Sequence, residues 1–281
     1  MPKAGLISLT FDDALDEHLD HAIPLLAAHG VSATFYVPVS APAFLRRIDE
    51  WRRVAEDGHE LGNHTIFHPA TERKSWVVPG NAIESYCLDR MRLEIETANR
   101  MLEALDGQTQ RTFAYPCSVT VLGRHGWPNR LLHHLGLERT RWPGLLERSS
   151  MDWGSSLQSY VCLLEHLVFA ARGGGLMLDS VIPAPNTMRR YEIPSAAVEG
   201  HSFSAMRAFV ERGLARNFWT ILQFHGVGGG HHMNCRLDDF RDLVNWLGDH
   251  HGDRVVTVVQ GARTLWSAEA VSANVSEVVL A

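Results

Sequence analysis

Short apolar segments alternate with segments of helical periodicity along the whole of this 281-residue chain. The runs 5–9 and 217–224 are almost continuously apolar, which is typical of parallel strands buried on both faces. Between them, residues 82–105 repeat apolar side chains at the spacing of a helix, as in Leu88, Met91 and Ile95. This alternation predicts a parallel α/β architecture, either a barrel or an open sheet. The length suits one such domain, so we expect a single domain over residues 1–281.

Acidic and histidine side chains stand where predicted strands end. Asp12 and Asp13 follow the first apolar run, and neighbouring side chains on a strand point to opposite faces, so we expect the two carboxylates to have different roles. His64 and His68 are four residues apart, and one helical turn ended by Pro69 would bring both rings to one side. One Asp and two His make a metal site with open positions for water and substrate. The other Asp is then free to act as a general base.

Five segments together resemble the motifs of the polysaccharide deacetylase superfamily, the carbohydrate esterases that remove acetyl groups from sugars. In chain order they are Thr10-Phe11-Asp12-Asp13, His64-Thr65-Ile66-Phe67-His68-Pro69, Phe113-Ala114-Tyr115-Pro116-Cys117-Ser118, Ala171-Arg172-Gly173-Gly174 and Ile221-Leu222-Gln223-Phe224-His225. The resemblance implies an α/β fold with a parallel, incomplete (β/α) barrel of about seven strands. It also implies a metal-dependent hydrolase that releases acetate from an N- or O-acetylated carbohydrate.

The resemblance assigns a role to each matched side chain. A divalent metal, zinc first and Co²⁺, Ni²⁺ or Mn²⁺ as alternatives, would be held by Asp13, His64 and His68. Asp12 would be the general base and His225 the general acid. The backbone N–H of Cys117 would help to bind the oxyanion, together with the metal. These assignments give one acid and one base in different roles, which predicts a bell-shaped pH profile.

The third motif departs from the family pattern. The family often has an Arg that pairs with the catalytic Asp, and Ala114 stands at that position here. Asp12 must therefore be oriented by another group, for which Arg172 is the candidate. An aromatic residue followed by Gly is also common where Cys117 and Ser118 stand, which changes the expected shape of the pocket. A backbone donor at Cys117 does not depend on the side chain.

Four residues are further candidates for contacts with the substrate: Tyr115, Arg172, Trp127 and Trp153. The tryptophans belong to a stretch, 118–160, that is rich in Gly, Pro, Arg and Trp and reads as long loops. Aromatic faces stack on sugar rings, so Trp127 and Trp153 could form subsites. The alternative is that large aromatic residues simply anchor these loops.

Composition excludes several partners. The chain has 26 Lys and Arg against 32 Asp and Glu, so no clustered positive surface for nucleic acid is expected. It contains no apolar run long enough for a membrane span. No room for a signal peptide precedes the first strand, so a cytoplasmic location is expected. Four scattered cysteines suggest reduced thiols. The oligomeric state is not readable.

Other local expectations and two alternative functions follow from the same sequence. His18, His21 and His29 are expected on the wet face of the first helix, 255–259 as the last strand, and 267–281 as a loosely attached tail. His231 and His232 fit either a second metal or pH-sensitive site or, more simply, a polar loop. The acetylated saccharide could be replaced by a small non-sugar amide. A non-catalytic metal- or sugar-binding protein is the third possibility.

Overall fold

The computed structural model describes residues 5–137, 140–149 and 151–267. Its centre is a seven-stranded sheet in the order β7-β4-β3-β2-β1-β9-β8, and every pair in it is parallel. The strands are β1 (Leu6–Asp12), β2 (Thr34–Val37), β3 (Glu60–Asn63), β4 (Thr112–Ala114), β7 (Ala170–Arg172), β8 (Ala196–Ala197) and β9 (Trp219–Phe224). Single bridges, Arg172 to Ile193 and Leu176 to Ala196, lie between the two edges. The result is an incomplete (β/α) barrel with open edges, as the resemblance implies.

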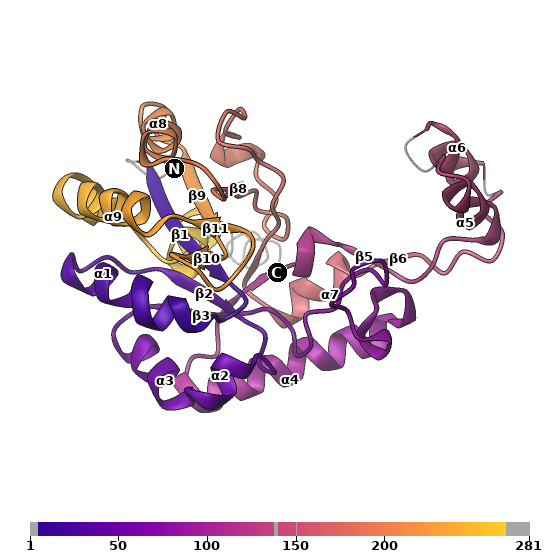
Figure 1. Ribbon diagram of the computed structural model, residues 1–281, viewed down its shortest axis with the longest axis horizontal. Helices are drawn as coiled ribbons and strands as arrows, with labels where there is room; N and C mark the ends of the chain where they lie inside the picture. Colours follow the sequence, from indigo (N-terminus) through magenta and orange to yellow (C-terminus); the bar gives the residue numbers. More distant parts are fainter. Residues whose placement is uncertain (1–4, 138–139, 150, 268–281) are drawn as a thin grey trace, which may run out of the picture.

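Helices cover the outer face of this sheet (Figure 1). They are α1 (Ile23–Ala28), α2 (Pro42–Arg46), α3 (Ile48–Glu56), α4 (Leu88–Asp106), α7 (Val161–Leu167), α8 (Phe203–Leu214) and α9 (Leu237–His251). The apolar seam of α4 is buried as its periodicity predicts, and the helix ends at Gly107 in the left-handed conformation (φ 70°). Within the described residues no helix is long and apolar enough to cross a membrane, and the four cysteines are free.

An arm projects from this body on the side of α7 (Figure 1). Its base is a two-stranded antiparallel ribbon of β5 (Val121–Leu122) and β6 (Gln158–Ser159). At its far end lie two short helices, α5 (Trp127–His134) and α6 (Trp142–Arg148). We call residues 124–157, which lie beyond this ribbon, the arm. The sequence predicted only loops here, yet Pro128 and Pro143 stand at the starts of both helices, where proline is favoured.

Two further local predictions, for His18 and for residues 255–259, are wrong. His18 lies in a π-helical turn (His18–Ala22) before α1 and is fully buried, not on the wet face. A π turn holds more residues than an α turn, so the residues in it face other directions than an α-helical wheel places them. Residues 255–259 are not a strand, because Val255 makes only a single bridge to Ile7 and residues 258–267 are helical. The predicted tail lies, from residue 268 on, outside the described residues.

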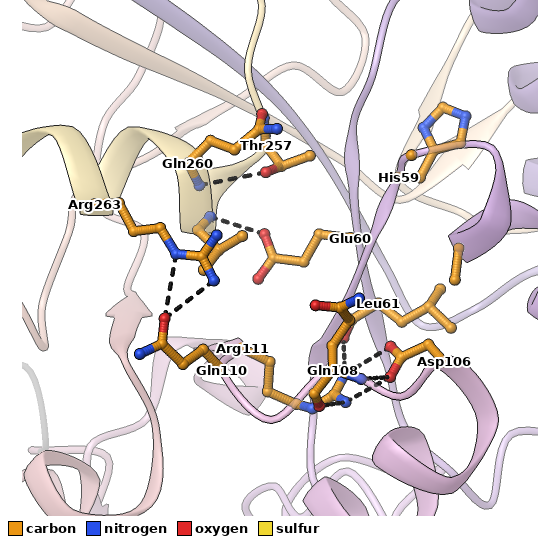
Figure 2. A pocket seen from close by; sticks show the side chains of 13 residues that line it. His59, Glu60, Leu61, Asp106, Gln108, Gln110, Arg111, Thr257, Gln260 and Arg263 are labelled. Carbon is orange, nitrogen blue, oxygen red and sulfur yellow. Dashed lines mark hydrogen bonds and ion pairs between the residues drawn. The ribbon is translucent and has the colours of Figure 1, made fainter.

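Hydrogen bonds to Glu60 hold the helical segment 258–267 at the N-terminal end of the sheet. The buried carboxylate of Glu60 accepts hydrogen bonds from Thr112 N (2.9 Å), Thr112 Oγ1 (2.7 Å), Thr34 Oγ1 (2.8 Å) and Val259 N (2.9 Å). Thr34 Oγ1 in turn accepts from Val258 N (2.8 Å). Side chains thus take the first N–H groups of the helix, where no neighbouring carbonyl exists. Figure 2 shows Glu60 among the residues that line a pocket of about 220 Å³ at this end.

Candidate active site

The candidate catalytic residues gather at the opposite, C-terminal end of the strands. Asp12 is the last residue of β1 and Arg172 the last of β7. His64 follows β3 directly and His225 follows β9. Cys117 lies three residues beyond β4. Loops at the carboxyl ends of parallel strands are where barrel and open-sheet enzymes place their chemistry. The fold therefore brings together side chains that lie more than two hundred residues apart in the chain.

Asp13, His64 and His68 form a compact group of metal-type ligands, whose donor atoms all lie within 4.8 Å of one another. Asp13 Oδ1 is 3.3 Å from His68 Nε2 and 3.8 Å from His64 Nε2. His64 Nδ1–H donates to the carbonyl of Ala114 (2.8 Å), which leaves the lone pair of Nε2 facing Asp13. Burial, with the neighbouring His68, lowers the pKa of His64 to about 4, so the ring is neutral as a ligand must be. The donor set fits a divalent metal.

The turn that carries both histidines is not the helical turn predicted from their spacing. Thr65 (φ 67°) and His68 (φ 50°) are in the left-handed region, and no helix is formed between β3 and residue 69. Asn63 holds the turn instead: its Oδ1 accepts from Thr65 N (2.7 Å), and its Nδ2 donates to Ile95 O (2.9 Å) on α4. The two rings still come together, with centroids 4.7 Å apart.

Backbone strain is concentrated at this site. Within the described residues, seven non-glycine residues have positive φ, and six of them belong to the motif loops: Asp13, Ala14, Thr65, His68, Cys117 and Ser118. Such conformations cost free energy and persist where surrounding structure enforces them, commonly at functional sites. At Cys117 (φ 50°, ψ 25°) the strain lies at the proposed oxyanion donor itself. The loops after β1, β3 and β4 are therefore shaped for the position of their side chains and N–H groups.

Arg172, at the end of β7, forms the ion pair with Asp12 that Ala114 cannot form. Its Nη2 donates to both oxygens of Asp12, at 2.7 and 2.6 Å, and both side chains are almost completely buried. Gln223 Nε2 adds a third bond to Asp12 (3.1 Å). Burial would raise the pKa of Asp12, but Arg172, His64 and His225 outweigh it and lower the pKa to about 2. Asp12 is thus a fixed carboxylate at every physiological pH.

His225 lies beside Asp12 and is held by a residue that the sequence did not indicate. Its Nδ1–H donates to Glu199 Oε1 (2.5 Å), while its Nε2 is 3.8 Å from Asp12 Oδ2. Burial lowers the pKa of His225, but the hydrogen bond to Glu199 and the charges of Asp12 and Asp13 outweigh it, so the pKa is raised. Glu199 belongs to no recognisable motif, and only the fold brings it beside the end of β9.

The buried His18 holds the backbone of His225 by a hydrogen bond. Its Nε2–H donates to the carbonyl of His225 (2.7 Å), and its Nδ1 accepts from Leu15 N (3.2 Å). Burial lowers the pKa of His18 to about 4, so it is a neutral hydrogen-bonding residue. It fixes the backbone at the end of β9 to the loop after Asp13.

Comparison with known proteins shows which family this chain resembles. Residues 2–121 match the family model described as polysaccharide deacetylase. The matched part, which contains β1 to β4 and the metal-type ligands, is similar to the polysaccharide deacetylase family. Among solved structures, the fold resembles a candidate polysaccharide deacetylase from Mycobacterium smegmatis, with 14% identity, a TM-score of 0.57, and 96% of this chain and 93% of that one covered. It also resembles a family 4 acetyl xylan esterase from Clostridium thermocellum in complex with a cobalt ion, with 18% identity, a TM-score of 0.51, and coverage of 92% and 91%.

Curated relatives match over part of their length. A peptidoglycan-N-acetylglucosamine deacetylase from Bacillus cereus is 25% identical over 193 residues, which are 64% of this chain and 63% of that protein. A gellan lyase from a Bacillus species is 27% identical over 114 residues, which are 41% of this chain and only 4% of the lyase.

The predicted substrate contacts lie in different surroundings. Tyr115 is buried and donates its hydroxyl to Tyr191 O (2.7 Å), and Arg172 is engaged by Asp12 as described. Trp127 starts α5, and the ring of Trp153 lies near it at a tilt of 39°, with ring centroids 6.0 Å apart, so both belong to the projecting arm (Figure 1). A role for these two in substrate binding stays a prediction, and it requires a substrate long enough to reach the arm.

Other aromatic side chains lie beside the metal-type ligands. Trp76 is 52% exposed, and its ring centroid is 5.5 Å from that of His68. Phe67, next to His68, is 46% exposed. On the other side, His231 stacks on His225 (centroids 5.2 Å apart, planes 18° apart) and His232 lies against His231. Phe67, Trp76 and His232 are exposed, and together with the half-buried His231 they form the rim of the site.

Proposed function

We propose that this chain is a metal-dependent deacetylase that hydrolyses N- or O-acetyl groups of a carbohydrate and releases acetate. The observation that carries the proposal is the group Asp13, His64 and His68, which lies beside a buried carboxylate, Asp12, and a histidine of raised pKa, His225. A metal-ligand set next to one base and one acid is what hydrolysis of an acetyl group requires.

A divalent metal bound by the three ligands, zinc being our first choice, would supply a Lewis acid for the acetyl carbonyl and lower the pKa of a water molecule. Asp12 accepts the proton of the attacking water. Its contacts with Arg172 and Gln223 hold the carboxylate ionised and fixed in direction. The N–H of Cys117, in its strained turn, donates to the oxygen that gains negative charge.

His225 then protonates the leaving nitrogen or oxygen of the sugar. The carboxylate of Glu199 on Nδ1 keeps the proton-bearing ring in one orientation and leaves Nε2 directed toward Asp12. Because the pKa of His225 is raised, the acid form persists to higher pH than for a free histidine. The acid and the base thus act in opposite protonation states at the same pH.

The rim favours a sugar over a small non-sugar amide. Trp76 and Phe67 present exposed aromatic surface beside His68, and such faces stack on sugar rings. The acetyl xylan esterase and the peptidoglycan-N-acetylglucosamine deacetylase to which the chain is similar agree with an acetylated saccharide.

The test is acetate release from a panel of acetylated xylo- and chito-oligosaccharides, with and without a chelator. Acetate from any member that disappears with the chelator supports the proposal and identifies the sugar class. Trp76→Ala should raise KM more than it lowers kcat, with the exposed Trp142→Ala as the matched control. If metal is bound but no member of the panel releases acetate, the carbohydrate assignment is overturned in favour of a small amide or a non-catalytic protein.

A further inference from the structure

The arm is too small to hold itself together by a hydrophobic core. Its tryptophans, Trp127, Trp142 and Trp153, are 52%, 53% and 57% exposed. Its helices α5 and α6 pack on one another at the end of a two-stranded ribbon, away from the body (Figure 1). Units below about 40 residues usually need a disulfide, a metal or a partner to be stable. No cysteine lies in the arm, which leaves a metal or a partner.

A second group of metal-type ligands lies within this arm. His125 precedes α5, Glu147 is in the last turn of α6, and Asp152 is on the segment that returns to β6. His125 Nδ1 is 3.2 Å from Glu147 Oε1 and 3.8 Å from Asp152 Oδ2. The three donor atoms lie within 4.8 Å of one another.

These distances match those of the candidate active site. There, Asp13 Oδ1 is 3.3 and 3.8 Å from its two histidine nitrogens. Ligands about 2.0–2.1 Å from a tetrahedral ion stand roughly 3.3 Å apart, so both groups are close to the required spacing. Two carboxylates and one neutral imidazole also balance the charge of a divalent cation.

The amide of Asn129, which contacts Glu147, has a buried oxygen without a hydrogen-bond partner, and this is a second observation that indicates a ligand. Asn129, on α5, is only 5% exposed, and among the described residues its Oδ1 has no hydrogen-bond partner. Its amide lies at the cluster: Nδ2 is 3.5 Å from Glu147 Oε1, and the backbone N donates to Asp152 Oδ1 (3.2 Å). A buried amide oxygen without a donor is costly, and it is a good neutral ligand for a cation.

Asp152 also has a structural task, which leaves it free to bind. Its oxygens accept from Gly126 N (2.9 Å) and Asn129 N (3.2 Å), and so cap the first turn of α5. A carboxylate has about four acceptor positions, so these two bonds leave two for a metal. The cap fixes the carboxylate in place beside His125.

We propose that the arm contains a second, structural divalent-metal site formed by His125, Glu147 and Asp152, beside the buried amide of Asn129. The ion joins the segment before α5, the end of α6 and the return segment, and it takes the place of the missing core. One imidazole and two carboxylates suit Zn²⁺ or another first-row divalent ion.

The test is metal content and arm protection in the full-length chain. Apoprotein is dialysed against Zn²⁺ alone, and bound zinc is measured by mass spectrometry of the elements. We expect two ions per chain in the wild type and in the control His134→Ala, an exposed histidine on α5 outside the cluster. We expect one ion in Glu147→Gln and in His125→Gln. Zn²⁺ should also slow proteolytic cleavage within residues 124–157 at least fivefold in the wild type and not in these two variants.

The outcomes are distinct from those of the proposed function, because no catalytic activity is measured. Glu147→Gln keeps the size of the side chain and its acceptor for Asn129, so its far-ultraviolet circular dichroism should match the wild type. One ion per chain in the wild type, removed by His64→Ala and not by Glu147→Gln, would overturn the arm site. Two ions retained in both arm variants would overturn it as well.

Discussion

The buried pair of Arg172 and Asp12 allows the sharpest quantitative prediction, for the substitution Arg172→Met. The contacts of Asp12 place its pKa at about 2 against an ordinary 3.8. At 1.36 kcal/mol for each pH unit, this stabilises the ionised form by about 2 kcal/mol. Removing the guanidinium leaves a buried carboxylate without its cation, for which roughly 3–5 kcal/mol is typical. We expect the free energy of unfolding at pH 7 to fall by between about 2 and 5 kcal/mol.

The pH dependence of this loss has a defined sign. In the wild type the folded pKa of Asp12 lies below the unfolded value, so the stabilisation is present above pH 4 and is lost as the pH falls toward 2. In the variant, burial acts without Arg172 and raises the pKa above its ordinary value. Ionised Asp12 then destabilises the fold, and the deficit should shrink as the pH falls from 7 toward 4.

The assay is urea denaturation between pH 4 and 7, followed by tryptophan fluorescence, with a chelator present so that bound metal does not contribute. Arg172 also donates to Ser195 Oγ (3.1 Å), so a double-mutant cycle with Asp12→Asn is needed to isolate the pair. A coupling energy below about 0.5 kcal/mol, or a deficit that does not change with pH, would refute the reasoning.

Three further perturbations test other parts of the account. Glu199→Gln should lower the pKa of His225 and move the high-pH limb of the pH–rate profile to lower pH; an unchanged limb would remove His225 from the role of acid. Glu60→Gln leaves one acceptor oxygen for four donors and should cost about 3 kcal/mol of unfolding free energy, measured with urea; a loss below 1 kcal/mol would contradict its role as an anchor. His18→Phe keeps an aromatic ring but leaves the carbonyl of His225 and Leu15 N without their hydrogen-bond partner. It should lower the free energy of unfolding by about 2 kcal/mol with metal content unchanged, and full stability would show that these bonds are dispensable.

The central strands and the metal-type ligands could be predicted because their signals are local. The run before Asp12 and the run before His225 are continuously apolar, and the structure places them side by side as β1 and β9. The histidines His64 and His68 come together as predicted, although through a strained turn held by Asn63 and not through a helical turn. Spacing alone indicates that two side chains can meet, and the turn that joins them depends on hydrogen bonds from elsewhere.

Other features depend on contacts that no local pattern contains. Val258 and Val259 have the propensity of a strand, yet Thr34 and Glu60 take their N–H groups and start a helix. His18 faces inward because a π turn changes the register of its helix. Glu199 contacts His225, which lies 26 positions further along the chain. The proline at the start of each arm helix is, by contrast, a local sequence signal for a helix start.

The central claim is that a divalent metal at Asp13, His64 and His68 is required for acetate release. The most direct measurement titrates Zn²⁺ or Co²⁺ into metal-free Glu147→Gln protein, which lacks the proposed arm site, and follows metal binding and acetate release from an acetylated oligosaccharide together. The account predicts no activity without metal, a rise that ends at one equivalent, and no activity at any metal level in Glu147→Gln combined with His68→Ala. Full acetate release from metal-free protein, or from the His68→Ala combination, would contradict it.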